Sequence, residues 1–128
     1  MKEQKKSKGS IRIFTDGSGQ HPDGTSSGFA WVREDTKEQH IERVDGLTNN
    51  AAEYRAVISA LQKLWPNSGA EILTDSLLVV SQLRGEYRIL DPKLGKLASE
   101  VKTIAERKHL KLKLTWVPRK DNLAGKLL

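Results

Sequence analysis

The amino-acid sequence predicts an α/β fold with one mixed β-sheet flanked by helices. Apolar and polar residues alternate in the first third of the chain, which is the spacing of strands with one covered face. From Asn49 the spacing of apolar residues changes to that of a helix, and segments with strand and helix patterns then alternate along the chain. The 128 residues show no internal repeat or linker, so we expect a flexible basic tail at 1–10 and one domain at 11–128.

The first three strands are predicted to form an antiparallel meander. The first strand begins at Ile11, and we expect it to end at Asp16, where Gly17 lets the chain turn into a loop. Segments 28–34 and 39–44 have the composition of two further strands. Because only a short polar segment connects these two strands, they favour an antiparallel hairpin.

A long helix after Asn49 is the most regular helical pattern in the chain. Its apolar stripe consists of Tyr54, Val57, Ile58, Leu61, Leu64 and Trp65. Thr48 precedes the helix as a capping residue, and Pro66 ends it. The remaining predicted elements are, in order, a strand at 71–75, a helix at 76–83, a helix ending near Lys108, a strand at 110–116 and a helix beginning at Asp121 or Asn122.

Three acidic residues are predicted to meet at one edge of the sheet. A strand that returns after a helix usually runs parallel to the earlier strand, so Asp75 should emerge beside Asp16. Glu53 lies in the first turns of the long helix and borders its apolar stripe. Asp16 and Glu53 also have ordinary interpretations, as a turn residue and a first-turn helix residue. Crowded carboxylates repel one another unless a cation binds them, and oxygen ligands favour Mg²⁺ or Mn²⁺, which act in pairs in displacement at phosphorus.

The composition favours a polyanionic partner. The chain has 22 lysines and arginines against 16 aspartates and glutamates, a formal charge of +6, and such proteins bind polyanions by releasing condensed counterions. The absence of cysteine excludes disulfides and thiolate metal sites. No apolar run is long enough for a signal peptide or a membrane span, so we expect a cytoplasmic monomer without a membrane partner.

Four short segments carry a resemblance to a known family. They are Thr15-Asp16-Gly17-Ser18, the segment 48–54, Leu73-Thr74-Asp75-Ser76 and Trp116-Val117-Pro118-Arg119. In this order and at this spacing they resemble the characteristic segments of the ribonuclease HI family, or type 1 ribonuclease H. The resemblance implies a ribonuclease H-like five-stranded mixed sheet of order 3-2-1-4-5 flanked by helices. It also implies hydrolysis of the RNA strand of RNA/DNA hybrids by a two-metal mechanism that uses Mg²⁺ or Mn²⁺.

The resemblance also implies roles for individual residues. Asp16, Glu53 and Asp75 would be the catalytic metal ligands. Contacts to the RNA/DNA hybrid would come from Gly17, Ser18, Thr48, Asn49 and Asn50. Amides, hydroxyls and backbone groups suit this task because they can detect the 2′-hydroxyl that distinguishes RNA from DNA. The alternative for the two asparagines is helix capping, which Thr48 could equally perform.

The chain departs from the family at the fourth active-site position. The family usually places an aspartate on the last helix, after an asparagine and an alanine, whereas this chain reads Lys120-Asp121-Asn122-Leu123-Ala124-Gly125-Lys126. Either Asp121 or Asn122 could fill that place, and we favour Asn122 as a catalytic metal ligand. Its neutral carboxamide oxygen would bind a metal more weakly than a carboxylate. We therefore expect a preference for Mn²⁺ or a reduced rate.

Two further departures concern basic residues. The family's mobile histidine is absent and Arg119 stands nearby, where it can bind phosphate or help release product. We therefore include Arg119 among the catalytic residues. The basic protrusion of some members is also missing, so contacts to the DNA strand would fall to Arg84, Arg88, Lys93 and Lys96, unless these form an ordinary solvated face. The three histidines, His21, His40 and His109, lack ligand spacing and are expected at the surface.

Two other functions are compatible with the sequence. The altered final helix would suit a hybrid-binding module of the same fold with weak or lost catalysis. The same fold could instead act on other nucleic acids, as its integrase and junction-cleaving relatives do, although the paired asparagines favour a ribonuclease.

Overall fold

A five-stranded mixed sheet forms the centre of the molecule. The computed structural model describes residues 10–128, so the predicted tail lies outside the described residues except for Ser10. The strands are β1 (Ile11–Ser18), β2 (Gly28–Arg33), β3 (Gln39–Arg43), β4 (Gly69–Thr74) and β5 (Lys111–Trp116). Their order is β3-β2-β1-β4-β5, with β1–β2 and β2–β3 antiparallel and β1–β4 and β4–β5 parallel. The predicted fold class and strand order are confirmed.

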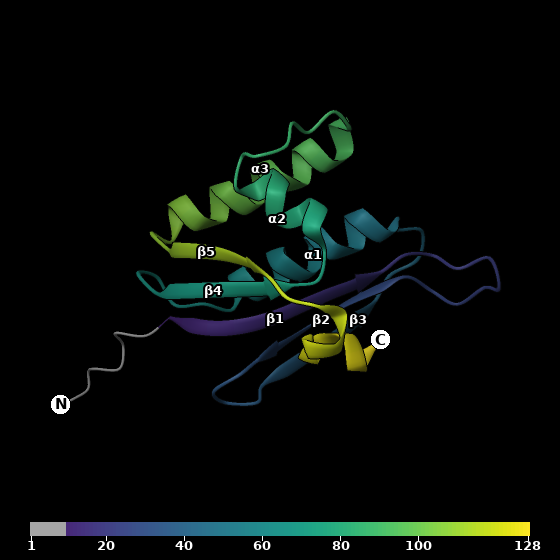
Figure 1. Cartoon of the computed structure of the whole chain (residues 1–128), viewed down its shortest axis with the longest axis horizontal. Coiled ribbons are helices and arrows are strands. Elements are labelled where there is room, and N and C mark those ends of the chain that lie inside the picture. The colour runs from purple at the N-terminus through teal and green to yellow at the C-terminus, as the bar shows by residue number, and fades with distance from the viewer. Residues whose placement is uncertain (1–9) are drawn as a thin grey trace.

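Three helices cover one face of this sheet (Figure 1). They are α1 (Asn49–Gln62), α2 (Leu77–Leu83) and α3 (Pro92–Arg107). Their N-termini are capped by Thr48, Ser76 and Asp91, whose side chains accept hydrogen bonds from free backbone N–H groups of the first turn. The main hydrophobic core lies between helices and sheet and includes Ile13, Trp31, Tyr54, Val57, Leu61, Ile72, Val79, Val101 and Leu114.

The helix pair α1 and α3 is joined at one end by a single lysine. The ammonium group of Lys108, just after α3, donates hydrogen bonds to the backbone carbonyls of Leu61, Gln62 and Leu64, over 3.1, 2.8 and 2.8 Å. These carbonyls lie at the C-terminal end of α1, where intrahelical donors run out and a cation is favoured.

The opposite face of the sheet is partly covered by the C-terminal segment. Figure 1 shows this segment, in yellow, lying across the sheet on the near side. It packs Ala124, Leu123 and Leu127 against Phe14, Val32 and Leu73 of the sheet. The prediction of one final α-helix is wrong, because the segment consists of two short 3-10 helices, η2 (Arg119–Asp121) and η3 (Leu123–Leu127). Asn122 breaks the helix between them, since its backbone is extended (φ −85°, ψ 105°) and its side chain caps η3.

The end of β1 also differs from the prediction. The strand does not stop at Asp16: Asp16 pairs with Ala30 and Gly17 with Phe29 in the antiparallel ladder to β2. The parallel ladder to β4 ends earlier, at Phe14 and Leu73. Asp16 therefore lies inside the sheet on one side and beyond the paired region on the other. Among residues 10–128, no helix is long and apolar enough to cross a membrane.

Candidate metal-binding and catalytic site

Three carboxylates from three separate elements meet where β1 and β4 diverge. Asp16 comes from β1, Glu53 from the first turns of α1, and Asp75 from the residue after β4. One oxygen of each lies within 4.8 Å of the others. Asp16 is 1% exposed, and the side chain of Asp75 is 10% exposed. The predicted convergence of these acids is therefore what the structure shows.

Close contact between two backbones brings Asp16 and Glu53 together. A Cβ atom added to Gly17 would lie 2.3 Å from the carbonyl carbon of Ala52 and 2.3 Å from the backbone nitrogen of Glu53. Only glycine fits where β1 crosses the first turns of α1. The sequence interpretation of Gly17 as a turn residue was wrong, because the glycine is required for this approach and lies within the strand.

The electrostatics of the metal-free site favour bound protons. Burial, together with the nearby charges of Asp16 and Asp75, raises the pKa of Glu53 to about 9. Burial, with the charge of Asp75, also raises the pKa of Asp16 to about 6. Two buried carboxylate oxygens, Asp16 Oδ1 and Glu53 Oε1, have no hydrogen-bond partner in the part of the chain that the structure describes. Unsatisfied carboxylate oxygens this close together have the chemistry of a site for a hard divalent cation.

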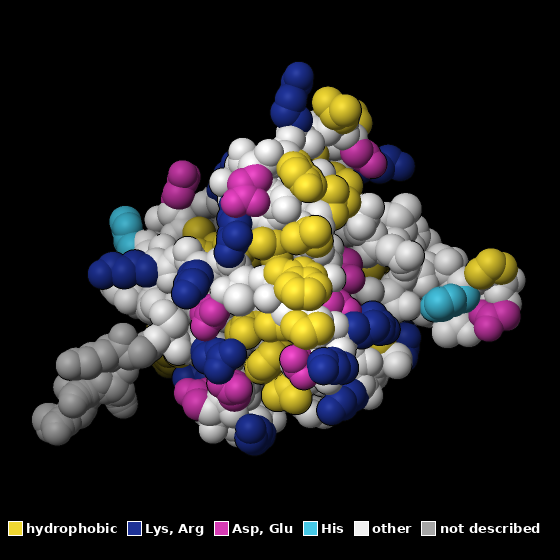
Figure 2. Space-filling model, in the orientation of Figure 1, with side chains coloured by type: hydrophobic (Ala, Val, Ile, Leu, Met, Phe, Trp, Pro, Cys, Tyr) yellow, Lys and Arg dark blue, Asp and Glu magenta, His cyan; other side chains and the backbone are white. Residues whose placement is uncertain are grey.

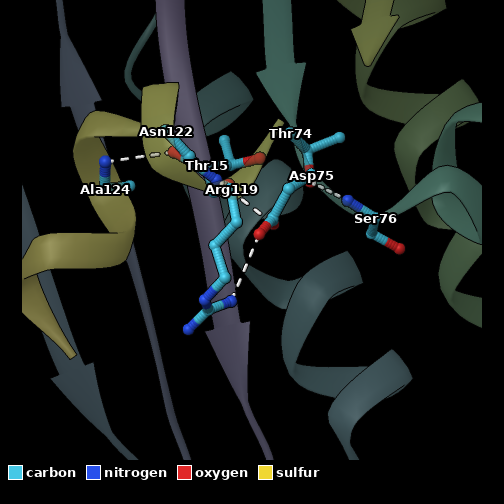
Figure 3. Close-up of polar contacts among 7 residues, drawn as sticks. All are labelled: Thr15, Thr74, Asp75, Ser76, Arg119, Asn122 and Ala124. Atoms are coloured by element: carbon cyan, nitrogen blue, oxygen red, sulfur yellow. Dashed lines mark hydrogen bonds and ion pairs between the residues drawn. The ribbon is translucent and has the colours of Figure 1, made fainter. Parts of the chain in front are cut away.

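Asp75 is held from two sides. Figure 3 shows the side chain of Arg119 reaching it from η2, with Nη1 donating to Oδ2 over 3.2 Å. On the other side, Nδ2 of Asn122 donates to Asp75 Oδ1 over 3.3 Å and to the carbonyl of Thr15 over 2.9 Å. The oxygen of Asn122 instead accepts from the backbone N–H of Ala124. The carboxamide nitrogen therefore faces the acids, contrary to the orientation that the predicted ligand role for Asn122 requires.

Gly125 is the C-terminal residue that the sequence interpretation missed. A Cβ atom at this position would lie 3.8 Å from Oδ2 of Asp16, in ordinary van der Waals contact. Gly125 also follows Asn122 and Ala124 in the chain, which is the signal that could have identified it. Asp121, the other predicted candidate, is exposed on η2 and does not belong to the acidic cluster among the described residues.

The predicted hybrid contacts lie at the end of β1 and at the start of α1, and hydrogen bonds join these two regions. The backbone N–H of Gly19 donates to Asn49 Oδ1 over 2.6 Å, and that of Gln20 donates to the carbonyl of Leu47 over 2.8 Å. Thr48 caps α1 through the N–H of Ala51. The side chain of Asn49 therefore joins the start of α1 to the residue after β1 instead of capping the helix. Asn50 is exposed at the start of α1, and Ser18 lies at the end of β1 with its hydroxyl 3.1 Å from Nε2 of His21.

All four predicted basic contacts are exposed, and hydrogen bonds anchor one of them, Arg84. Arg84 donates two hydrogen bonds to the carbonyl of Leu114, over 3.2 and 2.7 Å, which ties α2 to β5. Arg88, Lys93 and Lys96 are exposed before and along α3. The predicted surface histidines differ in a similar way, because His21 and His109 are exposed whereas His40 is half-buried and stacks on Trp31 with 5.9 Å between ring centroids.

Exposed apolar side chains lie beside the acids. In Figure 2, hydrophobic side chains form a band across the middle of the visible face, with acidic and basic side chains next to it. Leu77, at the start of α2, is 56% exposed, and Trp116, at the end of β5, is 46% exposed. Leu77 comes two residues after Asp75 in the chain. Trp116 pairs in the sheet with Thr74, the residue before Asp75. The cluster of acids is thus bordered by apolar surface.

Comparison with known proteins places the chain among ribonucleases H. It is similar to the bifunctional protein Rv2228c of Mycobacterium tuberculosis, with 38% identity over 78 residues, which is 59% of this chain and 21% of the relative. The chain thus matches about a fifth of the length of its curated relatives. Among solved structures, the N-terminal RNase H domain of Rv2228c, fused to maltose-binding protein, matches with a TM-score of 0.76 and 30% identity over 88% of this chain and 85% of that chain.

Two further solved structures match over most of their length. LC11-RNase H1 in complex with an RNA/DNA hybrid has a TM-score of 0.80 and 27% identity, with 93% of both chains covered. RNase H1 of the halophilic archaeon Halobacterium salinarum NRC-1 has a TM-score of 0.79 and 26% identity, with 94% of both chains covered. The RNase H family model matches residues 8–122. With its sheet order, its acidic cluster and this match over most of its length, the chain belongs to the RNase H family.

Proposed function

We propose that the protein is a divalent-metal-dependent endonuclease that hydrolyses the RNA strand of RNA/DNA hybrids. The observation that carries the proposal is the cluster of Asp16, Glu53 and Asp75, whose oxygens approach within 4.8 Å. One carboxylate oxygen of Asp16 and one of Glu53 are buried without a hydrogen-bond partner among residues 10–128. Family membership supports a nuclease of this kind. A cytoplasmic location and a monomeric state belong to the proposal on the sequence alone.

Asp16, Glu53 and Asp75 are the proposed ligands of Mg²⁺ or Mn²⁺. When bound, a pair of such ions would activate water as the nucleophile and stabilise the departing 3′ oxygen. The protein supplies the geometry, because backbone contact at Gly17 and the hydrogen bonds on Asp75 hold the carboxylates before the ions arrive. Arg119 is 74% exposed, so its guanidinium can contact a scissile or product phosphate beside Asp75.

The hybrid is proposed to lie across the end of β1, the start of α1 and the apolar border. Gly17, Ser18, Thr48, Asn49 and Asn50 offer backbone groups, hydroxyls and amides on the side of Asp16 and Glu53. These groups can recognise 2′-hydroxyls of the RNA strand. Beyond Asp75, Leu77 and Trp116 offer apolar contact, and Arg88, Lys93 and Lys96 offer positive charge for the DNA strand.

A labelled-duplex assay tests the proposal. An RNA/DNA duplex labelled on the RNA strand is incubated with the wild type and with Glu53→Gln, each with Mg²⁺ or Mn²⁺. We expect wild-type protein to cut the RNA strand internally, and Glu53→Gln to lose this activity. RNA/RNA and DNA/DNA duplexes of the same sequence serve as controls. Cutting of the DNA/DNA duplex, or full activity of Glu53→Gln, would contradict the proposal.

A second candidate function is a hybrid-binding module with weak or lost catalysis. Two observations favour it: Gly125 adds no carboxylate opposite Asp16, and Arg119 already pairs with Asp75. The same assay separates the two functions when combined with a gel-shift measurement. Binding of the hybrid without cleavage, with either metal, would support the module and exclude the nuclease.

A further inference from the structure

We propose that Asn122 is a positioning residue that holds Asp75, and that its oxygen is not a metal ligand. The proposal deepens the proposed function, since Asp75 matters here as one of the three metal-binding acids. It depends on the place of Asn122 between η2 and η3, where the residue is 1% exposed and its side chain is hydrogen-bonded to Thr15, Asp75 and Ala124. Figure 3 shows the carboxamide between Thr15, Asp75 and Ala124.

The chemistry of its neighbours fixes the orientation of the carboxamide. The carbonyl of Thr15 can only accept a hydrogen bond, so it requires Nδ2, which lies 2.9 Å away. The backbone N–H of Ala124 can only donate, so it requires Oδ1, which lies 3.1 Å away. Rotating the amide by half a turn would place oxygen against oxygen and N–H against N–H in a buried site. Presenting the oxygen to a metal would therefore break both bonds.

The second proton on Nδ2 gives Asn122 its role toward the acids. It points to Asp75 Oδ1 over 3.3 Å, while the other Asp75 oxygen receives Arg119 over 3.2 Å. Arg119 is 74% exposed and free to exchange Asp75 for another anion, whereas Asn122 is enclosed. Asn122 is thus the lasting restraint on this carboxylate, and it adds no negative charge to the crowded site. The chain would then offer three carboxylates, and no carboxamide oxygen, as metal ligands.

Metal-binding measurements on Asn122→Ser test this role without substrate. Serine can still accept the Ala124 N–H as a helix cap, but it has no second donor for Asp75. We expect the dissociation constant for Mn²⁺, measured by calorimetry, to rise roughly tenfold, as for other residues that orient metal ligands. Asp91→Ala, which removes the cap of α3, is the stability control and should leave Mn²⁺ affinity unchanged. Unchanged Mn²⁺ affinity in a destabilised Asn122→Ser would reduce Asn122 to a purely structural residue and overturn the proposal.

The side-chain amide of Asn122 reports the difference between restraint and ligand directly. In protein labelled with ¹⁵N-asparagine, the Asn122 NH₂ signal is assigned by its loss in Asn122→Ser. We expect slow hydrogen exchange of this group with and without Mg²⁺, because its bonds persist. Accelerated exchange on addition of Mg²⁺ would mean that the amide turns over to offer its oxygen, and would overturn the proposal. A protein that binds Mn²⁺ without cutting hybrids would contradict the proposed nuclease but leave both tests valid, whereas one that binds no Mn²⁺ overturns both.

Discussion

Glu53 is a half-buried residue with one buried carboxyl oxygen, and ionisation of its side chain opposes folding. Its pKa is raised to about 9 because burial and two neighbouring acids disfavour the negative charge. In metal-free protein near neutral pH it is therefore protonated, and the folded state binds this proton more tightly than the unfolded state does. The stabilisation is complete below the ordinary pKa, near 4.5, and is lost as the pH rises through about 9.

The first prediction concerns stability as a function of pH. Glu53→Gln should abolish most of the fall in unfolding free energy between pH 5 and pH 9 in chelator, and be more stable than wild type by roughly 2 kcal/mol at pH 9. Urea denaturation at a series of pH values measures this. Glu100→Gln, at an exposed position on α3, is the control and should follow wild type. Parallel curves for Glu53→Gln and wild type would contradict the prediction.

The second prediction is that metal binding displaces a proton. At pH 7 the proton on Glu53 must leave before its carboxylate can bind a cation, whereas Asp16, with a pKa of about 6, is largely ionised. Calorimetry in two buffers with different ionisation enthalpies should show release of about one proton per protein when Mn²⁺ binds at pH 7. Release should approach two protons below pH 6. Equal heats in the two buffers at pH 7 would contradict this.

The third prediction adds a carboxylate at Gly125. Its Cβ would lie 3.8 Å from Asp16 Oδ2 without a clash, so Gly125→Asp places a fourth acid at the cluster. We expect tighter Mn²⁺ binding and lower stability of the metal-free protein, by about 1–2 kcal/mol, because the added charge is repelled until an ion is present. Lys126→Asp, an exposed acid one residue later, is the control. Looser Mn²⁺ binding in Gly125→Asp would contradict the prediction.

For single residues, the meeting of the three acids could be predicted from the sequence, whereas the hydrogen-bond partners of Asn122 could not. Asp16, Glu53 and Asp75 stand next to predicted strand and helix ends, and topology brings such ends together. The orientation of Asn122 depends instead on the carbonyl of Thr15, 107 residues away, and on Ala124. No local pattern carries information about a donor and an acceptor brought together only by the fold.

The contact between β1 and α1 sets the geometry at the scale of elements. Gly17 touches the backbone of Ala52 and Glu53, so the strand and the helix meet without any intervening side chain. The buried bond from the Tyr54 hydroxyl to Gln82 Oε1, over 2.8 Å, joins α1 to α2 behind the acids. The two contacts therefore fix α1 against β1, which contains Asp16, and against α2, which follows Asp75.

The fourth prediction tests the contact at Gly17. Gly17→Ala would place a methyl group 2.3 Å from backbone atoms of α1, so the two elements must separate. We expect a loss of at least 3 kcal/mol in unfolding free energy, by roughly the cost of overpacking, together with loss of Mn²⁺ binding. Gly95→Ala, within α3, is the control, because a Cβ atom at this position would lie 3.8 Å from Cγ2 of Ile89, without a clash. It should leave the unfolding free energy unchanged or raise it slightly. A stable Gly17→Ala that binds Mn²⁺ normally would contradict the prediction.

The final helix shows why element types could not all be predicted. Leu123 and Leu127 have the spacing of one helical face, and both do pack on the sheet. The same two contacts are compatible with a shorter 3-10 turn, and periodicity over five residues cannot distinguish the two. The long pattern of α1, by contrast, spans several turns and does form a helix, but the helix ends at Gln62, and Trp65, the last residue of the predicted stripe, lies beyond it and is 79% exposed.

The whole molecule combines a formal charge of +6 with a concentrated acidic site. Because the proposed partner is a polyanion, positive charge away from the acids must supply much of the attraction. The exposed residues Arg88, Lys93 and Lys96 lie on one segment before and along α3. Lys63, by contrast, stands at the C-terminal end of α1, the end opposite to Glu53.

The fifth prediction concerns salt. Hybrid binding, measured with Ca²⁺ to suppress cleavage, should weaken with salt, and replacing Lys93 and Lys96 by alanine should reduce the slope of log affinity against log salt by about 2. Lys63→Ala should leave the slope unchanged. Equal slopes for wild type and the double variant would show that this segment does not touch phosphate.

Lys108 has a practical consequence for chemical modification of the protein. Its ammonium group is half-buried and occupied by three carbonyls at the end of α1, whereas the other described lysines are exposed. Amine-reactive dyes or supports used in limiting amounts will therefore attach to the other lysines first. Exhaustive acylation will reach Lys108 last, remove its charge and break its hydrogen bonds to those carbonyls, so the degree of labelling has a threshold above which the fold is weakened.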